Sequence, residues 1–288
     1  VKKKHFRIFS IQILKGINMN IEGQNLWALI LGASSGFGEA TALKLAEDGY
    51  NIIGVHLDRN ATMPHVQEVV NKINNQNVKA LFFNINAADE EKRKEVLDEL
   101  GNLKEGKPAI NVLMHSLAFG SLKPFVSADG KDVITKAQME MTLDVMANSL
   151  VYWTQDLVKR NMLARKARIF AMTSSGSHIS IPFYGAVSAA KAALESHIRQ
   201  LSLELGYLEV AANAIMAGVT DTPALRKIPG NDFLIEVAKS KNPRNRLTTP
   251  QDIANVISIL CKEGGEWISG GVINADGGED VVSHITGL

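Results

Sequence analysis

The chain has 288 residues, of which 45% are apolar and 21% are charged, and its formal net charge at pH 7 is +1. This length and composition suit a single α/β domain with a large core. Five of the 31 basic residues lie within residues 1–18, which leaves 26 bases against 30 acids elsewhere. That balance gives no reason to expect nucleic acid as a partner.

Residues 1–20 form a basic extension that contains one short apolar stretch, Ile8 to Leu14. The stretch is short for a signal peptide, and no small-residue cleavage site follows it. We expect a flexible extension, and contact with a membrane surface or another subunit is the alternative. No apolar run reaches the ~18 residues needed to span a bilayer, so we expect no stable membrane insertion.

Strands and helices alternate from about residue 26 onward. The predicted strands are Leu26–Leu31, Asn51–His56, Val78–Ile85, Ile110–His115, Arg168–Thr173, Val210–Met216 and Gly271–Ala275. The predicted helices are Gly38–Asp48, Pro64–Asn75, Asp89–Leu100, Met139–Met162, Gly185–Leu205 and Pro250–Cys261. This alternation indicates a doubly wound parallel sheet, a Rossmann-type α/β fold, and we expect residues 21–288 to form one domain.

Residues 219–248 interrupt the alternation with an irregular stretch punctuated by three prolines, Pro223, Pro229 and Pro243. The stretch follows the carboxyl end of a predicted strand, where open α/β sheets bind ligands. Its length is that of a functional loop, so we expect a lid over the substrate. A solvated charged loop is the alternative.

A glycine-rich turn, residues 32–38, directly follows the first predicted strand and opens a helix. Glycines allow the backbone to turn tightly and to approach a pyrophosphate, whose charge is stabilised by the free amides of a helix N-terminus. A tight turn without a ligand is the alternative. The residues of the turn predicted to bind a dinucleotide are Gly32, Ser34, Ser35, Gly36, Phe37 and Gly38.

Tyr184 and Lys191 lie near the start of the predicted helix 185–205, with six residues between them. A phenol and an ammonium so placed can polarise a carbonyl while a nicotinamide delivers hydride. An ordinary surface tyrosine at position 184 is the alternative.

These motifs resemble the short-chain dehydrogenase/reductase superfamily over nearly all of residues 24–280. Most members separate the tyrosine and the lysine by three residues, but here that position is Val187, which has no proton to give. The wider Tyr184–Lys191 spacing is similar to that of the enoyl-acyl-carrier-protein reductases in the same superfamily. The form His115-Ser116-x-x-Phe119 also resembles those reductases.

The chain departs from the superfamily pattern at one further position, since Met146 stands where most relatives have an asparagine that completes a proton relay. Ser174 stands at the place of the superfamily's usual serine, where the enoyl reductases often have a second tyrosine. His115 could act as a general base, but it resembles a residue that has a structural role beside the cofactor.

The resemblance implies a nicotinamide cofactor. An acid at the position of His56 would select NAD, and it is absent. Arg59 could hold a 2′-phosphate although Asp58 would oppose it, so the sequence favours NADPH over NADH. Further cofactor-binding residues implied by the resemblance are Arg59, Asn84, Ile85, Ser116, Leu117, Lys191, Gly218, Val219 and Thr222, and no metal is implied.

The implied reaction is reduction of the 2,3-double bond of an enoyl thioester, in fatty acid synthesis. The implied catalytic residues are Tyr184, Lys191 and Ser174, with Lys191 also lowering the pKa of the phenol. A carbonyl reductase, such as a 3-oxoacyl-thioester reductase, is the alternative, and a non-catalytic dinucleotide-binding regulator is a further one. The basic residues of the lid, which could attract an acidic carrier protein, are Lys227, Lys239, Lys241, Arg244 and Arg246.

Two expectations concern the whole molecule. The single cysteine, Cys261, rules out an internal disulfide and fits a reducing compartment such as the cytoplasm. The predicted helices 139–162 and 185–205 are apolar over more of their circumference than one sheet face can cover. We therefore expect a homo-oligomer, most simply a tetramer, with a helix covered by its own chain as the alternative.

Overall fold

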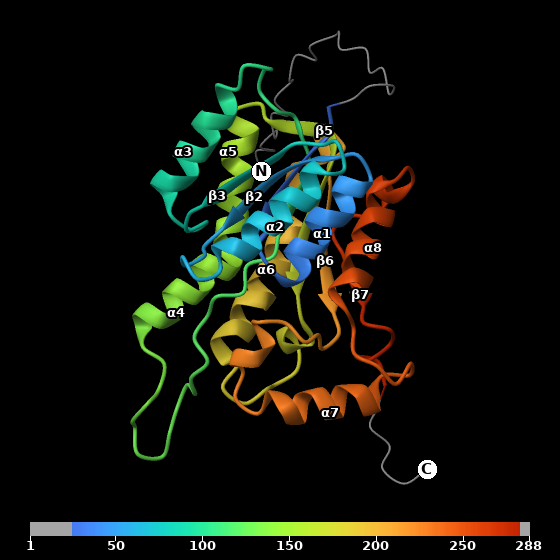
Figure 1. Cartoon of the computed structure of the whole chain (residues 1–288). Coiled ribbons are helices and arrows are strands. Elements are labelled where there is room, and N and C mark those ends of the chain that lie inside the picture. Colours follow the sequence, from blue (N-terminus) through green and yellow to red (C-terminus); the bar gives the residue numbers. More distant parts are fainter. Residues whose placement is uncertain (1–24, 283–288) are drawn as a thin grey trace, which may run out of the picture.

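The computed structural model of the chain describes residues 25–282. Within them, seven parallel strands form one sheet in the order β3-β2-β1-β4-β5-β6-β7 (Figure 1). The predicted Rossmann-type α/β fold is confirmed. The strands are β1 (Trp27–Leu31), β2 (Asn51–His56), β3 (Ala80–Asn84), β4 (Ile110–His115), β5 (Leu163–Thr173), β6 (Ala211–Ala217) and β7 (Val272–Ala275).

Helices cover both faces of this sheet. The helices are α1 (Gly36–Glu47), α2 (Met63–Asn74), α3 (Glu90–Gly101), α4 (Lys136–Leu143), α5 (Ser149–Lys159), α6 (Gly185–Glu204), α7 (Asn231–Lys241) and α8 (Pro250–Cys261). Side chains of α3, α5 and α6 pack into one hydrophobic cluster, and those of α1, α2 and α8 pack into a second. The central strands contribute to both clusters, so each face of the sheet is buried, as a parallel sheet requires.

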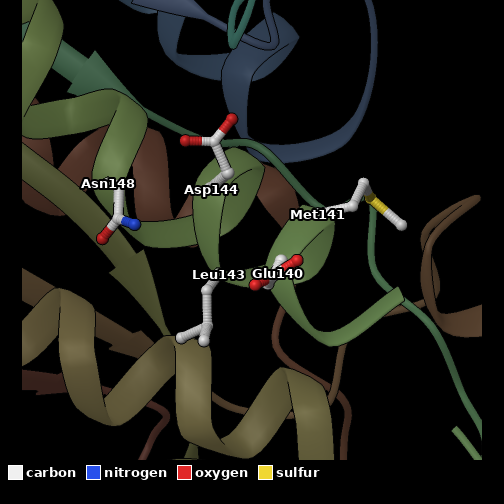
Figure 2. A pocket seen from close by; sticks show the side chains of 5 residues that line it. All are labelled: Glu140, Met141, Leu143, Asp144 and Asn148. Carbon is white, nitrogen blue, oxygen red and sulfur yellow. The ribbon is translucent and has the colours of Figure 1, made fainter. Parts of the chain in front are cut away.

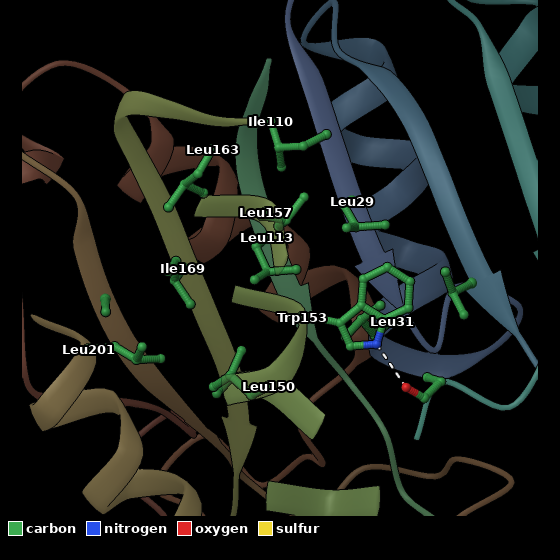
Figure 3. Close-up of a cluster of buried hydrophobic side chains, with 14 of the residues drawn as sticks. Leu29, Leu31, Ile110, Leu113, Leu150, Trp153, Leu157, Leu163, Ile169 and Leu201 are labelled. Atoms are coloured by element: carbon green, nitrogen blue, oxygen red, sulfur yellow. Dashed lines mark hydrogen bonds between the residues drawn. The ribbon is translucent and has the colours of Figure 1, made fainter. Parts of the chain in front are cut away.

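The first cluster is shown in Figure 3. Trp153 of α5 is fully buried among leucine and isoleucine side chains of the sheet, and its indole N–H donates to the carbonyl oxygen of Ala87 at 2.8 Å. A buried tryptophan needs such an acceptor for its single polar group. This contact fixes α5 against the loop between β3 and α3.

The chain order of the strands reverses beside β1. From β1 the chain runs outward to β2 and β3, and then returns to β4 on the other side of β1. In open α/β sheets, ligands bind outside the carboxyl ends of the strands at this reversal. The carboxyl ends of β1, β4, β5 and β6 are therefore the expected place for the site.

The single helix predicted over residues 139–162 is wrong in detail. The structure has α4, then one π-helical turn (Asp144–Asn148), then α5. A π turn inserts one residue into a helix and changes the direction in which the following side chains point. Here the change brings Ser149 to within 2.9 Å of the His115 ring of β4.

The interval 219–248 also differs from the irregular stretch expected there, because it contains α7. Gly230 precedes this helix with a φ of +77°, Asp232 lies in its first turn, and Lys239 and Lys241 lie in its last turn. Those charges suit the two ends of a helix dipole. The sequence did not predict α7, because the prolines on either side of it indicate irregular structure.

The expectation for residues 1–20 lies outside the described part of the chain. Between residues 25 and 282, no helix has both the length and the apolar character needed to cross a membrane.

Candidate active site

The glycine turn after β1 folds so tightly that Gly32 and Gly38 have no room for a side chain. The amide of Gly32 donates to the carbonyl oxygen of Val55 at 2.8 Å, and the backbone of Gly32 has a φ of +92°. A Cβ added to Gly32 would lie 2.5 Å from the carbonyl oxygen of Ser116. A Cβ added to Gly38 would overlap the carbonyl oxygen of Gly32. The first turn of α1 therefore packs directly on the end of β1.

The N-terminus of α1 is open to a ligand. Ser35 is the N-cap residue, and its side chain makes no capping hydrogen bond to the backbone. Gly36 has a φ of +56°, and the nearest atom to a Cβ there would be Thr222 Cγ2 at 3.5 Å. Free amides at a helix N-terminus, next to a glycine that adds no side chain, fit a pyrophosphate. These residues therefore fit a dinucleotide.

Two segments expected to line the cofactor lie beside the glycine turn. Ser116 and Leu117, which follow β4, both contact the position of a Cβ on Gly32. Thr222, which follows β6, lies next to Gly36. The structure thus brings the segments that follow β1, β4 and β6 together.

The ends of β2 and β3 are held together by a side-chain amide. Asn84 accepts a hydrogen bond from the Asp58 amide at 2.9 Å and donates to the Asp58 carbonyl oxygen at 3.0 Å. The amide of Ile85 donates to the carbonyl oxygen of His56 at 2.8 Å. Arg59 is exposed and has no ion-pair partner among the described residues. Asn84 here builds the loop that carries Asp58 and Arg59.

Asp58 follows β2 and is hydrogen-bonded to Ser34 of the glycine turn. Its carboxylate lies 2.9 Å from Nδ1 of His56 and 2.7 Å from the Thr62 hydroxyl. Burial alone would raise the pKa of Asp58, but hydrogen bonds from Ser34, Thr62 and His56 outweigh burial and lower that pKa. The sequence identified Asp58 only as a charge opposing Arg59, because the loop geometry that turns it toward Ser34 has no local signature.

Tyr184 and Ser174 are brought together by the structure. The two hydroxyl oxygens are 3.3 Å apart, and a Cβ added to Gly176 would lie 2.5 Å from the Tyr184 ring. Burial raises the pKa of Tyr184, although the hydrogen bond with Ser174 acts in the opposite direction. The phenol is therefore protonated at neutral pH and able to donate. The hydroxyl of Ser177 instead lies 3.2 Å from the neighbouring His178 ring.

Lys191 lies further along α6 than Tyr184, and its side chain is buried. Its ammonium donates to the carbonyl oxygen of Met172 at 2.6 Å. Burial lowers the pKa of Lys191 to about 8, although the charge of Glu195 acts in the opposite direction. The expectation that Lys191 lowers the pKa of the phenol stays a prediction.

His115 is a structural residue. Its ring is fully buried, and the Ser149 hydroxyl, which donates to the carbonyl oxygen of Val145 at 2.8 Å, accepts from Nε2 at 2.9 Å. Burial, followed by the charge of Lys191, lowers the pKa of His115 to about 3. A ring so buried and so weakly basic does not serve as the general base.

The two positions that depart from the superfamily pattern meet each other. Met146 and Val187 are both buried, and both lie 2.9 Å from the position that a Cβ on Gly120 would occupy. Thr142 Cγ2 closes the same small space at 2.7 Å. Apolar groups therefore fill the region in which most relatives place a polar relay.

Glu279 is a buried acid that the sequence did not single out. One carboxylate oxygen accepts from the Val219 amide at 3.1 Å, and the other has no hydrogen-bond partner among the described residues. Burial raises the pKa of Glu279, although the hydrogen bond from Val219 acts in the opposite direction. Its place just after the glycine pair at 277–278 was the only available signal.

The pocket shown in Figure 2 is lined by other residues than those described above. It lies along α4 and the π turn, and its lining residues are Glu140, Met141, Leu143, Asp144 and Asn148. None of them is a predicted site residue. Among residues 25–282, no group of His, Cys, Asp or Glu side chains is arranged to hold a metal.

Comparison with known proteins identifies the family. Residues 32–279 match the family model described as "Enoyl-(Acyl carrier protein) reductase". The chain is 29% identical over 253 residues to the uncharacterized oxidoreductase YjdA of Bacillus subtilis, covering 87% of this chain and 95% of that protein. It is 27% identical over 265 residues to the 3-oxoacyl-[acyl-carrier-protein] reductase FabG of Aquifex aeolicus, covering 90% and 99%.

A solved structure shares the fold. The enoyl-[acyl-carrier-protein] reductase (NADH) of Aquifex aeolicus superposes with a TM-score of 0.76 at 22% identity, covering 92% of this chain and 98% of that one. At this identity the likeness concerns the fold alone.

Proposed function

Because the chain belongs to the short-chain dehydrogenase/reductase superfamily, in the family described as enoyl-(acyl carrier protein) reductase, we propose that it reduces the 2,3-double bond of an enoyl thioester. The observation that carries the proposal is the pair Tyr184 and Lys191 at the wide spacing, with the Tyr184 hydroxyl 3.3 Å from Ser174. Val187, at the position of the usual tyrosine, is buried and apolar.

A reduced nicotinamide bound at the glycine turn would supply hydride to the β-carbon of the substrate, and a proton added at the α-carbon would complete the saturated product. Negative charge develops on the thioester oxygen as hydride arrives. Tyr184, kept protonated by burial, donates a hydrogen bond to that oxygen. Ser174 orients the phenol. The Lys191 ammonium would stabilise charge nearby and would bind hydroxyls of the cofactor.

The same features argue against the carbonyl reductase alternative. Reduction of a ketone requires the tyrosine to give its proton fully to an alkoxide and to recover it through a polar relay. Met146 and Val187 fill the relay region with apolar groups. Enolate stabilisation needs only a hydrogen-bond donor, which Tyr184 supplies.

For the cofactor we propose NADH, in place of the NADPH that the sequence favoured. Asp58 carries a negative charge beside Ser34 of the glycine turn. Burial would raise the pKa of Asp58, but three hydrogen bonds outweigh burial and lower that pKa. A 2′-phosphate placed there would be repelled, whereas a 2′-hydroxyl could donate to the carboxylate. Arg59 is exposed and therefore offers weaker compensation.

We further propose that the segment 219–248 covers the substrate and attracts an acidic carrier protein. We also propose that the protein acts in fatty acid synthesis in the cytoplasm and that it forms a homotetramer. Lys227, Lys239 and Arg244 are exposed on this segment. Arg246 is less available, because both of its terminal nitrogens bind Asp252.

The test is a paired assay of crotonyl and acetoacetyl thioesters, each with NADH and NADPH. We expect turnover of the crotonyl thioester, faster with NADH. Turnover of the keto substrate alone would refute the enoyl assignment. A thermal-shift measurement in which neither nucleotide stabilises the protein would refute the dinucleotide site, and stabilisation without turnover of either thioester would favour the regulator.

A further inference from the structure

The residues before Tyr184 form a tight turn. The amide of Tyr184 donates to the carbonyl oxygen of Ile181 at 3.1 Å, so Pro182 and Phe183 occupy the two central positions. The proline ring fixes a negative φ at the first position, and Phe183 has a φ of +65° at the second. This sequence of signs identifies a type II turn, whose second central position normally holds glycine or asparagine.

Phe183 is therefore in a strained conformation. Among residues 25–282, it is the only aromatic residue with a positive φ. A left-handed backbone is unfavourable for a bulky residue because its Cβ approaches a carbonyl oxygen. The ring is also 45% exposed, so burial in the folded chain does little to offset the strain. Strain of this kind is maintained mainly at functional sites.

Two exposed aromatic residues, Phe183 and Phe125, lie at the residues on either side of Tyr184. Phe183 precedes it directly, and the ring of Phe125 lies 2.6 Å from the position of a Cβ on Gly185, the residue that follows. Phe125 is 52% exposed and belongs to the long green segment that extends from the sheet ahead of α4 in Figure 1. Apolar walls around a few polar groups are typical of sites for apolar ligands.

We propose that Phe183 contacts the substrate and packs against the acyl chain next to the thioester carbonyl. This inference rests on the proposed function, since it takes the carbonyl to be the group that Tyr184 binds. The strained turn places Phe183 directly before Tyr184 in the chain. Binding of an acyl chain would cover the exposed part of the ring, which the fold alone leaves in water.

Two substitutions distinguish the effect of the strained backbone from the effect of the aromatic ring. Phe183→Asn removes the ring and supplies a residue that tolerates the left-handed backbone. Phe183→Ala removes the ring but keeps a Cβ in the same strained conformation. The two variants should therefore share an effect on substrate binding and differ in stability.

We expect both variants to raise the KM for trans-2-octenoyl-CoA roughly ten-fold, with kcat within two-fold and the dissociation constant for NADH unchanged. Phe183→Asn should also raise Tm by about 2–4 °C, and Phe183→Ala should not. Lys166→Asn is the matched control, because Lys166 has a φ of +57° in the amino-terminal half of β5, away from the site. It should raise Tm without changing KM.

An unchanged KM in both variants would overturn the proposal, and so would a fall in Tm for Phe183→Asn, which would mean that the ring supports the fold. Failure of the proposed function is a separate result. If the unmodified protein reduces only keto thioesters, the same comparison of KM is made with acetoacetyl-CoA and tests Phe183 on its own.

Discussion

At the scale of single residues, the Tyr184 hydroxyl and its contact with Ser174 are central. Tyr184→Phe removes a donor that acts mainly in the transition state, so kcat should fall by roughly 10²–10³ while nucleotide binding survives. Steady-state rates with crotonyl-CoA and calorimetric titration with NADH measure the two effects.

Val187→Ala is the control for that substitution. Val187 is buried against Gly120, so its truncation should cost about 2 kcal/mol of stability and leave most of the activity intact. If the alanine variant at 187 lost as much kcat as the phenylalanine variant at 184, the assignment of the catalytic tyrosine would be wrong.

The pH dependence of kcat/KM should follow the loss of the proton from the buried ammonium of Lys191. Its pKa is lowered to about 8, so kcat/KM should decline as the pH rises through 8 and the charge is lost. The phenol of Tyr184 has a raised pKa and should add no further limb in that range. Lys191→Arg keeps its charge, so its residual activity should stay flat to above pH 10; a limb near pH 8 in that variant would contradict the assignment.

Stability should change with pH in the opposite direction. Between the folded pKa of Lys191, about 8, and its ordinary value of 10.5, the unfolded chain binds a proton that the folded chain does not. This group therefore adds stability as the pH rises across that interval. Denaturant unfolding of the unmodified protein and of Lys191→Met, compared at pH 8 and pH 10, isolates its contribution.

The candidate catalytic residues could be selected from the sequence because the pattern that marks them is short-range. The glycine turn and the spacing of Tyr184 and Lys191 are read directly along the chain. The contact of His115 with Ser149 could not be predicted, since it joins residues 34 positions apart through a π turn. The orientation of Asp58 toward Ser34 likewise depends on how two loops pack.

At the scale of elements, the junction of β1 and α1 makes a sharp prediction. Gly38→Ala places a Cβ on the carbonyl oxygen of Gly32, and neither backbone can move without separating α1 from the sheet. We expect several kcal/mol of destabilisation and loss of NADH binding. Gly101→Ala, in α3 with no atom within 4 Å of the new Cβ, should instead be neutral or stabilise by up to ~1 kcal/mol.

The elements themselves were predicted well where the apolar pattern was continuous. The strand Asn51–His56 and the helix Pro250–Cys261 have the predicted bounds. Prediction failed for α7 and for the π turn Asp144–Asn148. The first is flanked by prolines that signal irregular structure, and the second has the same apolar periodicity as an uninterrupted helix.

The segment 219–248 gives a prediction about motion. If it covers the substrate, backbone hydrogen exchange in α7 should slow when NADH and a saturated acyl thioester are added together. Exchange in α8, which packs against α1 in the second hydrophobic cluster, serves as the internal reference. Equal exchange in α7 with and without ligands would count against a lid.

At the scale of the whole molecule, the apolar surface that suggested an oligomer is largely accounted for. Trp153 and Leu157 of α5, and Leu194 and Ile198 of α6, are buried in the chain's own core. Leu203 and Tyr152 remain exposed on these helices. The prediction of a homotetramer thus rests on a smaller surface than the sequence indicated, and sedimentation equilibrium at micromolar concentration tests it; a monomer would end the idea.

The packing of Met146 and Val187 around Gly120 has a stereochemical consequence. The side chains of Met146 and Val187 offer no polar group through which a proton could pass from that side to the reacting carbons. We therefore expect the hydrogen added at the α-carbon to come from the opposite side. Reduction of crotonyl-CoA in heavy water should then leave deuterium on a single face of that carbon, giving one chiral product.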